Sequence, residues 1–220
     1  MQVGLAEILE VLKPYGAKLV AVSKTHPPEA IMELYHAGQR IFGENRVKEL
    51  EIKSEVLPAD IEWHFIGPLQ TNKVKYIASF VQLIHSVDSL KLLEEINKQA
   101  IKHQRVINCL LEIKIAREAT KQGFELEEAI AALTDPMLPT LSNVRIIGVM
   151  GMATFTEDNI QIAHEFRYLK KGFEKIKERF FADDPAFCEL SMGMSGDYKI
   201  ALQEGSTMVR IGSLLFGERL

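Results

Sequence analysis

The feature that most constrains the fold is a regular alternation of short β-branched runs with longer segments of helical periodicity. Eight runs have the length and composition of strands: KLVAVS (18–23), QRIF (39–42), EWHFI (62–66), VQLIHSV (81–87), RVINCLLEI (105–113), VRIIGVM (144–150), CELS (188–191) and TMVRIG (207–212). Helices are predicted at 4–13, 28–37, 45–56, 70–80, 89–102 with Asp88 as its N-cap, and from Asp158 to Phe180.

This spacing favours a closed barrel. Sharing 220 residues among eight units leaves about 27 residues for each, enough for a strand of about 5 residues and a crossover of at least 10–12. Strands separated by helices pair in parallel through right-handed crossovers. We therefore expect an α/β fold, one (β/α)₈ TIM barrel domain over residues 1–220, with an extra N-terminal helix at 4–13. An open doubly wound sheet alternates in the same way and is the alternative.

Composition narrows the class of protein. The 26 basic and 30 acidic residues give a net charge of −4, which argues against nucleic acid or an anionic membrane surface as a partner. No apolar stretch approaches the roughly 18 residues of a membrane span, and the N-terminus lacks a basic region before its leucines. The two cysteines, Cys109 and Cys188, are isolated and predicted to be reduced and buried. These features predict a cytoplasmic protein.

Functional side chains are expected at the carboxyl ends of the strands, where sites of parallel α/β folds collect. Lys24 follows the first strand, and strand alternation predicts that it shares the barrel-facing side of Val20 and Val22. Desolvation beside apolar side chains would lower the pKa of such a lysine and make it a Schiff-base nucleophile. The alternative is a solvated lysine that simply ends a strand.

The turns after the last two strands suit a phosphate. LSMGMSGDYKIAL and VRIGSLLFG are small-residue turns that lead into helical segments, and loops at these positions bind phosphate in many barrels. The alternative is an ordinary helix start, with Ser195 as N-cap and Asp197 in the first turn. Arg210 lies two residues after Met208 on the same face of an apolar strand. Its guanidinium needs either an ion-pair partner or an acceptor on a ligand, since an unpaired buried charge is costly.

Taken together, the motifs KLVAVSKTHP, IFGENRVKEL, WHFIGPLQTNKVKYI, IHSVDS, GVMGMATFTED, LSMGMSGDYKIAL and VRIGSLLFGER resemble the YggS/PROSC family of pyridoxal-phosphate-binding proteins, from Lys18 to the end. The resemblance implies the pyridoxal phosphate (PLP) barrel of alanine racemase without its second domain. It also implies these site residues: Lys24 holding PLP as a Schiff base, Asn45 near the ring, His64 and Met150 lining the pocket, Ser195, Gly212 and Ser213 on the phosphate with Thr207 close to them, and Arg210 facing the pyridine nitrogen.

One segment departs from the family pattern. After the fifth strand the family often has a polar NxSxExSKxG stretch, whereas this chain has IKIAREATKQG (113–123). The difference affects the expected rim contacts of that loop and leaves the lysine and the phosphate turns unchanged.

The implied site favours holding the cofactor over using it. Arginine is permanently charged and can only donate hydrogen bonds, so Arg210 would favour an unprotonated ring nitrogen and a weak electron sink. Alanine racemase adds a tyrosine from its second domain, and the expected barrel occupies the whole chain. We expect a monomeric carrier for intracellular PLP and amino-acid homeostasis that delivers the cofactor to PLP-requiring apo-enzymes.

Two other functions stay open. One is a PLP-dependent amino-acid racemase, in which Lys24 would be a catalytic base. The other is a metal-dependent hydrolase, because His26, His64 and His85 all lie near predicted strand ends. The chain contains no HxH pair or HExxH motif and no carboxylate at a matching strand end, so we expect no metal site.

Overall fold

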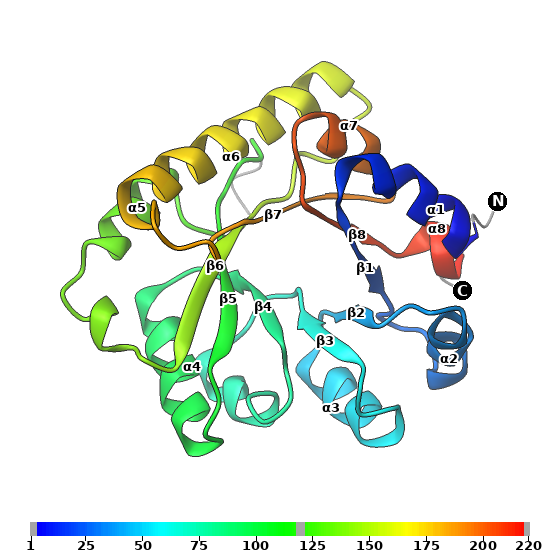
Figure 1. Ribbon diagram of the computed structural model, residues 1–220, viewed down its shortest axis with the longest axis horizontal. Helices are drawn as coiled ribbons and strands as arrows, with labels where there is room; N and C mark the ends of the chain where they lie inside the picture. Colours follow the sequence, from blue (N-terminus) through cyan, green and yellow to red (C-terminus); the bar gives the residue numbers. More distant parts are fainter. Residues whose placement is uncertain (1–3, 118–121, 218–220) are drawn as a thin grey trace.

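The computed structural model describes residues 4–117 and 122–217. Within them, eight parallel strands close into a barrel in chain order (Figure 1). The strands are β1 (Lys18–Val22), β2 (Ile41–Glu44), β3 (Glu62–Phe65), β4 (Leu83–Val87), β5 (Ile107–Glu112), β6 (Val144–Met150), β7 (Glu189–Met194) and β8 (Met208–Ile211). All eight strands overlap the predicted runs, and only β2 and β7 extend beyond them. The closed barrel is confirmed, and the open sheet is excluded because β8 pairs with β1.

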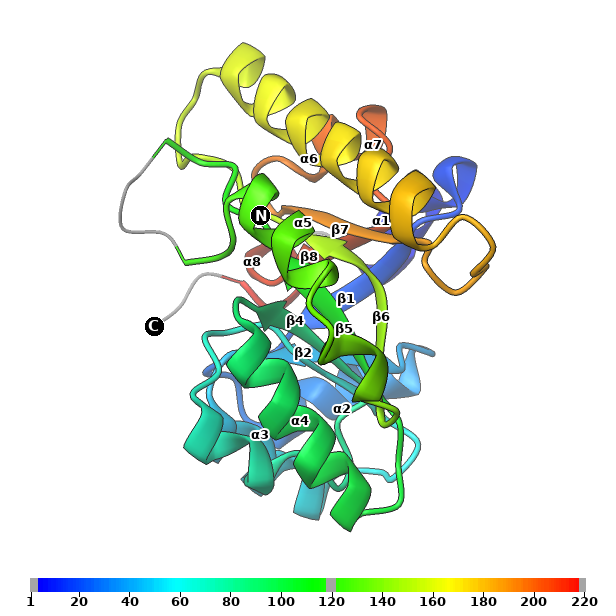
Figure 2. The ribbon, with the colours of Figure 1, turned by 90° about the vertical axis from the view of Figure 1, so that its left-hand side faces the viewer.

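Helices surround the strands on the outside of the barrel (Figure 2). They are α1 (Leu5–Leu12), α2 (Pro28–His36), α3 (Val47–Val56), α4 (Leu90–Lys102), α5 (Leu126–Leu133), α6 (Asn159–Phe180), α7 (Tyr198–Gln203) and α8 (Ser213–Phe216), with short 3₁₀ turns η1 (Lys13–Tyr15), η2 (Thr71–Tyr76) and η3 (Leu138–Thr140). The extra N-terminal helix predicted at 4–13 is confirmed as α1. None of the described helices is long and apolar enough to cross a membrane.

Local capping explains where two of these helices begin. Asp158 caps α6, and its carboxylate accepts from the backbone N–H groups of Ile160 and Gln161. The prediction that Asp88 caps α4 is wrong, because Ser89 has the extended backbone of a cap and its Oγ accepts from Leu92 N. Asp88 instead accepts a hydrogen bond from the Ser89 hydroxyl.

Two connections differ from the predicted helices. The segment expected to be helical at 70–80 forms the 3₁₀ turn η2, with the buried Val74 inside it and the buried Ile77 directly after it, three residues apart. A three-residue repeat suits a 3₁₀ turn because residues i and i+3 lie on the same side of it. Helix α5 was not predicted. It begins at a capping box in which Glu125 and Glu128 bond each other's backbone N–H groups.

The core has two parts. The larger part fills the space between strands and helices and includes the fully buried Phe42, Phe65 and Phe166. The smaller part lies inside the barrel and consists of Val20, Leu83, Leu110, Met150 and Met208. Because successive strand residues point to opposite faces, β1, β4, β5, β6 and β8 each contribute to both parts. The predicted barrel-facing position of Val20 is confirmed.

The cysteines differ in environment. Cys109 is buried on β5, and burial raises its thiol pKa well above the usual range. Cys188 is exposed, so its predicted burial is wrong. It lies one residue before β7, at the amino-terminal rim of the barrel, where its backbone N–H pairs with Ile147 O and its side chain is left outside the core.

We predict that Gly148→Ala destabilises the barrel severely. A Cβ at Gly148 would overlap the backbone carbonyl of Glu189 on β7, so two paired strands would have to separate. The free energy of unfolding should fall by about 3 kcal/mol, measured by urea denaturation. Gly196→Ala is the matched control, since a Cβ there meets nothing within 4 Å. Equal stabilities of the two variants would contradict the close approach of β6 and β7.

Candidate functional site

Lys24 lies at the rim of the barrel where β1 ends. The strand stops at Val22, and Ser23 adds one more ladder bond from its N–H to Gly43 O. The chain then turns, with His26 N donating to Ser23 O. Lys24 therefore follows the strand, as predicted, and its place on the face of Val20 and Val22 stays a prediction. Lys24 belongs to the turn and is half-buried.

The turns after β7 and β8 meet, as predicted. Ser195 Oγ accepts a hydrogen bond from Gly212 N at 3.3 Å, and Ser213 begins α8 directly after Gly212. A Cβ at Gly212 would lie 3.2 Å from the backbone oxygen of Val22, so this turn packs closely on the end of β1. The structure therefore brings Ser195, Gly212 and Ser213 beside the strand that leads to Lys24.

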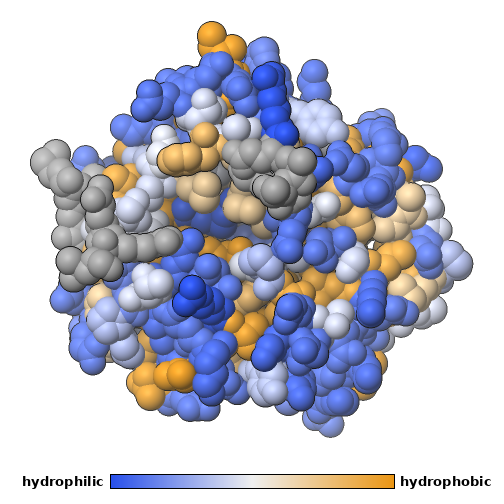
Figure 3. Space-filling view, turned by 180° about the vertical axis from the view of Figure 1, so that it is seen from behind, coloured by the Kyte–Doolittle hydropathy of each residue, from blue (hydrophilic) through white to orange (hydrophobic). Residues whose placement is uncertain are grey.

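A ring contact also joins the β1 turn to the last helix. The imidazole of His26 stacks on Phe216 of α8, with ring centroids 4.8 Å apart and an interplanar angle of 19°. Figure 3 shows this carboxyl end of the barrel, where hydrophobic side chains lie in a hollow near the centre and hydrophilic ones surround them. The mouth thus has an apolar floor and a polar rim.

Arg210 lies inside the barrel on β8 and is 4% exposed. Its Nη1 donates to the hydroxyl of Ser191 at 2.7 Å and to the Ser191 carbonyl at 3.0 Å, and its Nη2 donates to Gly151 O at 3.1 Å. Burial lowers the pKa of the guanidinium to about 10, against the raising effects of Asp197 and Glu112, so it stays charged at neutral pH. The groups that accept these hydrogen bonds are neutral.

Two histidines extend the hydrogen bonds of Arg210 across the barrel. His85 Nδ1 lies 3.1 Å from Ser191 Oγ, and His85 Nε2 lies 3.0 Å from His64 Nδ1. One assignment satisfies every group: Arg210 donates to Ser191, Ser191 to His85 and His85 to His64. Burial lowers the pKa of His64 to about 3 and that of His85 well below its usual value. Both rings are therefore neutral at physiological pH.

Glu112 is a buried carboxyl group that acts electrostatically on Arg210. It ends β5, is 5% exposed, and pairs in register with Met150 on β6. Burial raises its pKa to about 7, against the lowering effect of Arg210 and with a further increase from Asp88. At neutral pH this carboxyl is therefore partly protonated and does not neutralise Arg210.

Asn45 follows β2 on the same rim. Its Oδ1 is buried and has no hydrogen-bond partner among the described residues. The Gly67 turn after β3 packs against the Asn45 backbone, and a side chain at Gly67 would overlap it. Beside them a groove of about 1010 Å³ opens between α3, η2 and α4, lined in part by Asn45, Arg46 and Lys73. Asn45 therefore stands between the barrel mouth and this groove.

The remaining predicted site residues divide between the two ends of the barrel. Met150 ends β6, is 1% exposed and packs in the inner core, so it faces the barrel interior near the carboxyl end. The prediction that Thr207 lies close to the phosphate turns is wrong. Thr207 precedes β8, and its Oγ1 accepts from Leu190 N and donates to Glu189. The four residues of β8 separate it from Gly212, and the five steps along the chain span about 16 Å at about 3.3 Å each.

Two other expectations concern the loop after β5 and the histidines considered as metal ligands. The altered loop after β5 includes residues 118–121, which lie outside the described residues; next to them Arg117 N donates to Thr154 Oγ1. Of the three histidines considered as metal ligands, His64 and His85 bond each other and His26 stacks on Phe216. The described part of the chain holds no group of three or more His, Cys, Asp or Glu that could bind a metal.

Sequence reasoning missed part of the site. Ser191 was not singled out, and His85 was considered as a metal ligand or a rim residue although it links Arg210 to His64. The signal was present, because His85 lies two residues after Leu83 in a strand and so faces inward with it. Glu44 was also missed, although it lies next to Asn45 in the sequence Gly43-Glu44-Asn45.

Comparison with known proteins defines the class first. The sequence pattern of the family described as "Alanine racemase, N-terminal domain" matches residues 4–220. An alanine racemase from Clostridium difficile has the same fold, with a TM-score of 0.69 at 14% identity, and this chain covers 57% of it. The protein is thus a barrel of the alanine racemase N-terminal type.

More similar relatives then give the particular family. A pyridoxal phosphate homeostasis protein from Aquifex aeolicus is 45% identical over 204 residues, which cover 92% of this chain and 87% of that protein. The structure of PipY from Synechococcus elongatus PCC7942 without PLP is 37% identical with a TM-score of 0.86, covering 97% of this chain and all of PipY. PipY with PLP bound has a TM-score of 0.83 at 35% identity, covering 96% and 99%. The chain belongs to the pyridoxal phosphate homeostasis protein family, which confirms the YggS/PROSC resemblance.

The neutral state of His64 predicts a pH dependence of stability. Below pH 6.5 the unfolded chain takes up a proton at this residue, whereas the folded chain does not until about pH 3, so stability falls as the pH falls through this window. His64→Leu should reduce the slope of unfolding free energy between pH 6 and pH 5 by up to about 1.4 kcal/mol per pH unit. Urea denaturation at several pH values measures it, and parallel slopes for the two proteins would refute a neutral His64.

Proposed function

We propose that this protein holds PLP as a Schiff base on Lys24 and takes part in intracellular PLP and amino-acid homeostasis. The observation that carries the proposal is the meeting of three features at one end of the barrel: the Lys24 turn, the joined Ser195 and Gly212 turns, and the buried cation of Arg210. Family membership and the PLP-bound structure of PipY support it.

The residues present fit this cofactor. PLP carries an anionic phosphate and a ring with hydrogen-bond acceptors, and the mouth offers donors for both. Gly212 lets the backbone approach closely with its N–H beside the Ser195 hydroxyl, and Arg210 is a buried cation with neutral partners. The buried, unpartnered Oδ1 of Asn45 is a further polar atom that a ligand could satisfy. His64 and Met150 would line the inner side of the pocket.

Each residue then has a defined role. The amine of Lys24 bonds to the aldehyde carbon with loss of one water molecule, so hydrolysis or exchange with another amine reverses the attachment. Ser195, Gly212 and Ser213 would hold the phosphate through hydroxyl and backbone N–H groups. The cofactor when bound supplies an electron sink for chemistry at an amino-acid α-carbon.

Arg210 limits how strong that sink becomes. A guanidinium has no acceptor, so it can pair with the pyridine nitrogen only when that nitrogen is unprotonated. The Ser191 and Gly151 contacts fix the plane of the guanidinium, and the neutral histidines supply no proton to the ring. These residues favour storage and delivery of the cofactor, with little catalysis of their own.

The proposed function also includes a domain organisation, a cellular location, an oligomeric state and partners. The described residues form one barrel with its surrounding helices, which supports a single domain over 1–220. We also propose that the protein acts in the cytoplasm, is a monomer, and passes PLP to apo-enzymes that require it. Size-exclusion chromatography with light scattering tests the oligomeric state, and activation of a PLP-free enzyme by the loaded protein tests delivery.

We predict that Lys24→Ala abolishes covalent PLP binding. The wild-type protein should show the visible absorbance band of a lysine-bound PLP, and borohydride should fix one cofactor to the peptide that contains Lys24. Lys24→Ala should be colourless, whereas Lys91→Ala, a change at an exposed lysine of α4, should keep the wild-type spectrum. A coloured Lys24→Ala protein, or a label on another peptide, would disprove the assignment.

The racemase hypothesis has its own test. Incubation of the PLP-loaded protein with single L-amino acids should produce D-isomers, if any, far more slowly than about 1 per second, the lower range of ordinary enzyme turnover. Chiral chromatography of the products measures this rate. Turnover at or above that level that disappears in Lys24→Ala would favour a racemase over a carrier.

A further inference from the structure

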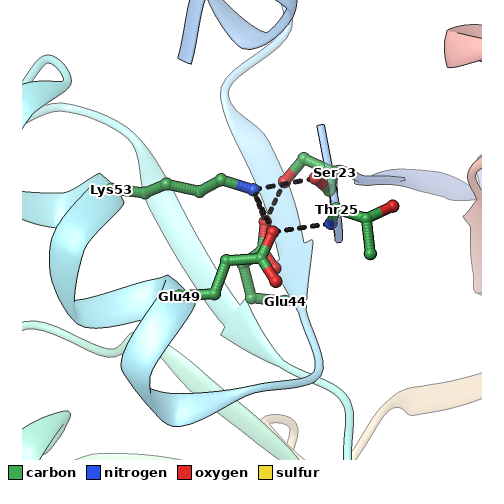
Figure 4. A network of polar contacts seen from close by, with 5 residues as sticks. All are labelled: Ser23, Thr25, Glu44, Glu49 and Lys53. Atoms are coloured by element: carbon green, nitrogen blue, oxygen red, sulfur yellow. Dashed lines mark hydrogen bonds and ion pairs between the residues drawn. The ribbon is translucent and has the colours of Figure 1, made fainter. Parts of the chain in front are cut away.

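A buried polar network lies directly behind the Lys24 turn (Figure 4). It joins Ser23 and Thr25, the two neighbours of Lys24, to Glu44 at the end of β2 and to Glu49 and Lys53 on α3. None of these five side chains is among the residues expected to contact the cofactor. The network therefore needs an explanation of its own.

Lys53 is the centre of the network. Its side chain is 5% exposed, and its Nζ donates to Ser23 O at 2.8 Å, Glu44 Oε1 at 2.6 Å and Glu49 Oε1 at 2.7 Å. A lysine ammonium has three protons, so every one is used. The positions of these three acceptors are therefore fixed relative to one another.

Ser23 is held at each of its polar groups. Its N–H donates to Gly43 O, its Oγ donates to Glu44 Oε1 at 2.7 Å, and its carbonyl accepts from both Lys53 and His26 N. Glu44 is fully buried, and burial raises its pKa despite the opposing effect of Lys53. The residue that precedes Lys24 is thus fixed to the end of β2.

Thr25, on the other side of Lys24, has a strained backbone. Its φ is 69°, in the left-handed region where a β-branched residue is an outlier that costs about 1–3 kcal/mol. The N–H of Thr25 donates to Glu49 Oε1 at 2.6 Å, which is the same oxygen that accepts from Lys53. Glu49 thus holds the strained residue and is itself held by the buried lysine.

The cost of burying these charged groups indicates that the network serves to fix the backbone around Lys24. Burying a lysine with two carboxylates costs several kcal/mol of desolvation, and hydrophobic replacement of buried ion pairs is often neutral or stabilising. The Oε2 atom of Glu44 is buried and has no hydrogen-bond partner among the described residues, which adds to the cost. A site that must hold one backbone conformation around a reactive side chain gains from such contacts on both sides.

We propose that Glu49, Lys53 and Glu44 are positioning residues for Lys24: they fix the Ser23–Thr25 turn so that the lysine amine meets the cofactor aldehyde in a reactive orientation. The proposal rests on the proposed attachment of PLP to Lys24. Because Asn45 follows Glu44 directly, the same contacts set the end of β2 relative to the end of β1. The network thereby fixes two sides of the pocket at once.

The test compares the rate at which PLP attaches to apo-protein in three variants of helix α3. Glu49→Ala removes the acceptor for Thr25 and Lys53, Glu49→Gln keeps an oxygen there, and Glu55→Ala is the matched control, an exposed glutamate on the same helix. Stopped-flow absorbance follows the visible band after PLP is added, at a temperature where circular dichroism shows each protein fully folded. Borohydride mapping identifies the labelled lysine.

We expect the rate constant to fall about tenfold or more in Glu49→Ala, since a shift of about 1 Å in a reacting group can cost a hundredfold. It should stay within about twofold of wild type in Glu49→Gln and Glu55→Ala. If Glu49→Ala does not fold, Ser23→Ala removes one hydroxyl of the network and should slow attachment about threefold. A lower melting temperature with an unchanged rate would show a structural role and overturn the proposal.

Three further outcomes can be distinguished from one another. A Glu49→Gln protein as slow as Glu49→Ala would overturn the hydrogen-bonding role of this residue. Wild-type protein that takes up no PLP on Lys24 would overturn the proposed function, and this inference with it. Wild-type attachment at Lys24 together with equal rates in Glu49→Ala and Glu55→Ala would overturn only the positioning role.

Discussion

The pairing of the last strand with the first is the contact on which the site depends. β8 runs parallel to β1 with Val20 opposite Arg210 and Ala21 opposite Ile211. This register closes the barrel and sets the turn after β8 against the end of β1, so Gly212 packs on Val22. Lys24 and Gly212 lie near opposite ends of the sequence, and the pairing of β8 with β1 brings the turns that carry them to one rim of the barrel.

Inside the barrel, apolar and polar residues lie at the same levels of neighbouring strands: Val20 pairs in register with Arg210, Leu83 with His64 and Met150 with Ser191. The inner apolar cluster, which includes Val20 and Leu110, supports the interior, and Arg210, Ser191, His85 and His64 form a continuous chain of hydrogen bonds across it. A buried polar chain is tolerable only when each member is satisfied. Burial lowers the pKa of both histidines, so both rings stay neutral and do not add two more buried cations beside the guanidinium.

The sequence was a good guide where structure is set locally. The eight strands follow from β-branched runs, and the meeting of the Ser195 and Gly212 turns follows from the common edge of parallel strands. The position expected for Thr207 came from the family resemblance, and it is wrong because this residue precedes β8 and so lies at the amino end of that strand. The bonds from Lys53 to Ser23 and Glu44 could not be predicted, since they join a helix to two strands through side-chain geometry that no periodicity encodes.

Lys53 and Arg210 are both buried cations, but they differ in the charge of the groups around them. Lys53 is neutralised by Glu44 and Glu49, so it acts on its surroundings through geometry. Arg210 keeps neutral hydrogen-bond partners, and Glu112, with its pKa raised to about 7, compensates it only in part. A guanidinium that is only partly compensated by Glu112 and Asp197 attracts an electron-rich ligand atom and opposes its protonation. In the proposed function, this effect would keep the ring nitrogen of the cofactor unprotonated and the electron sink weak, as a carrier requires.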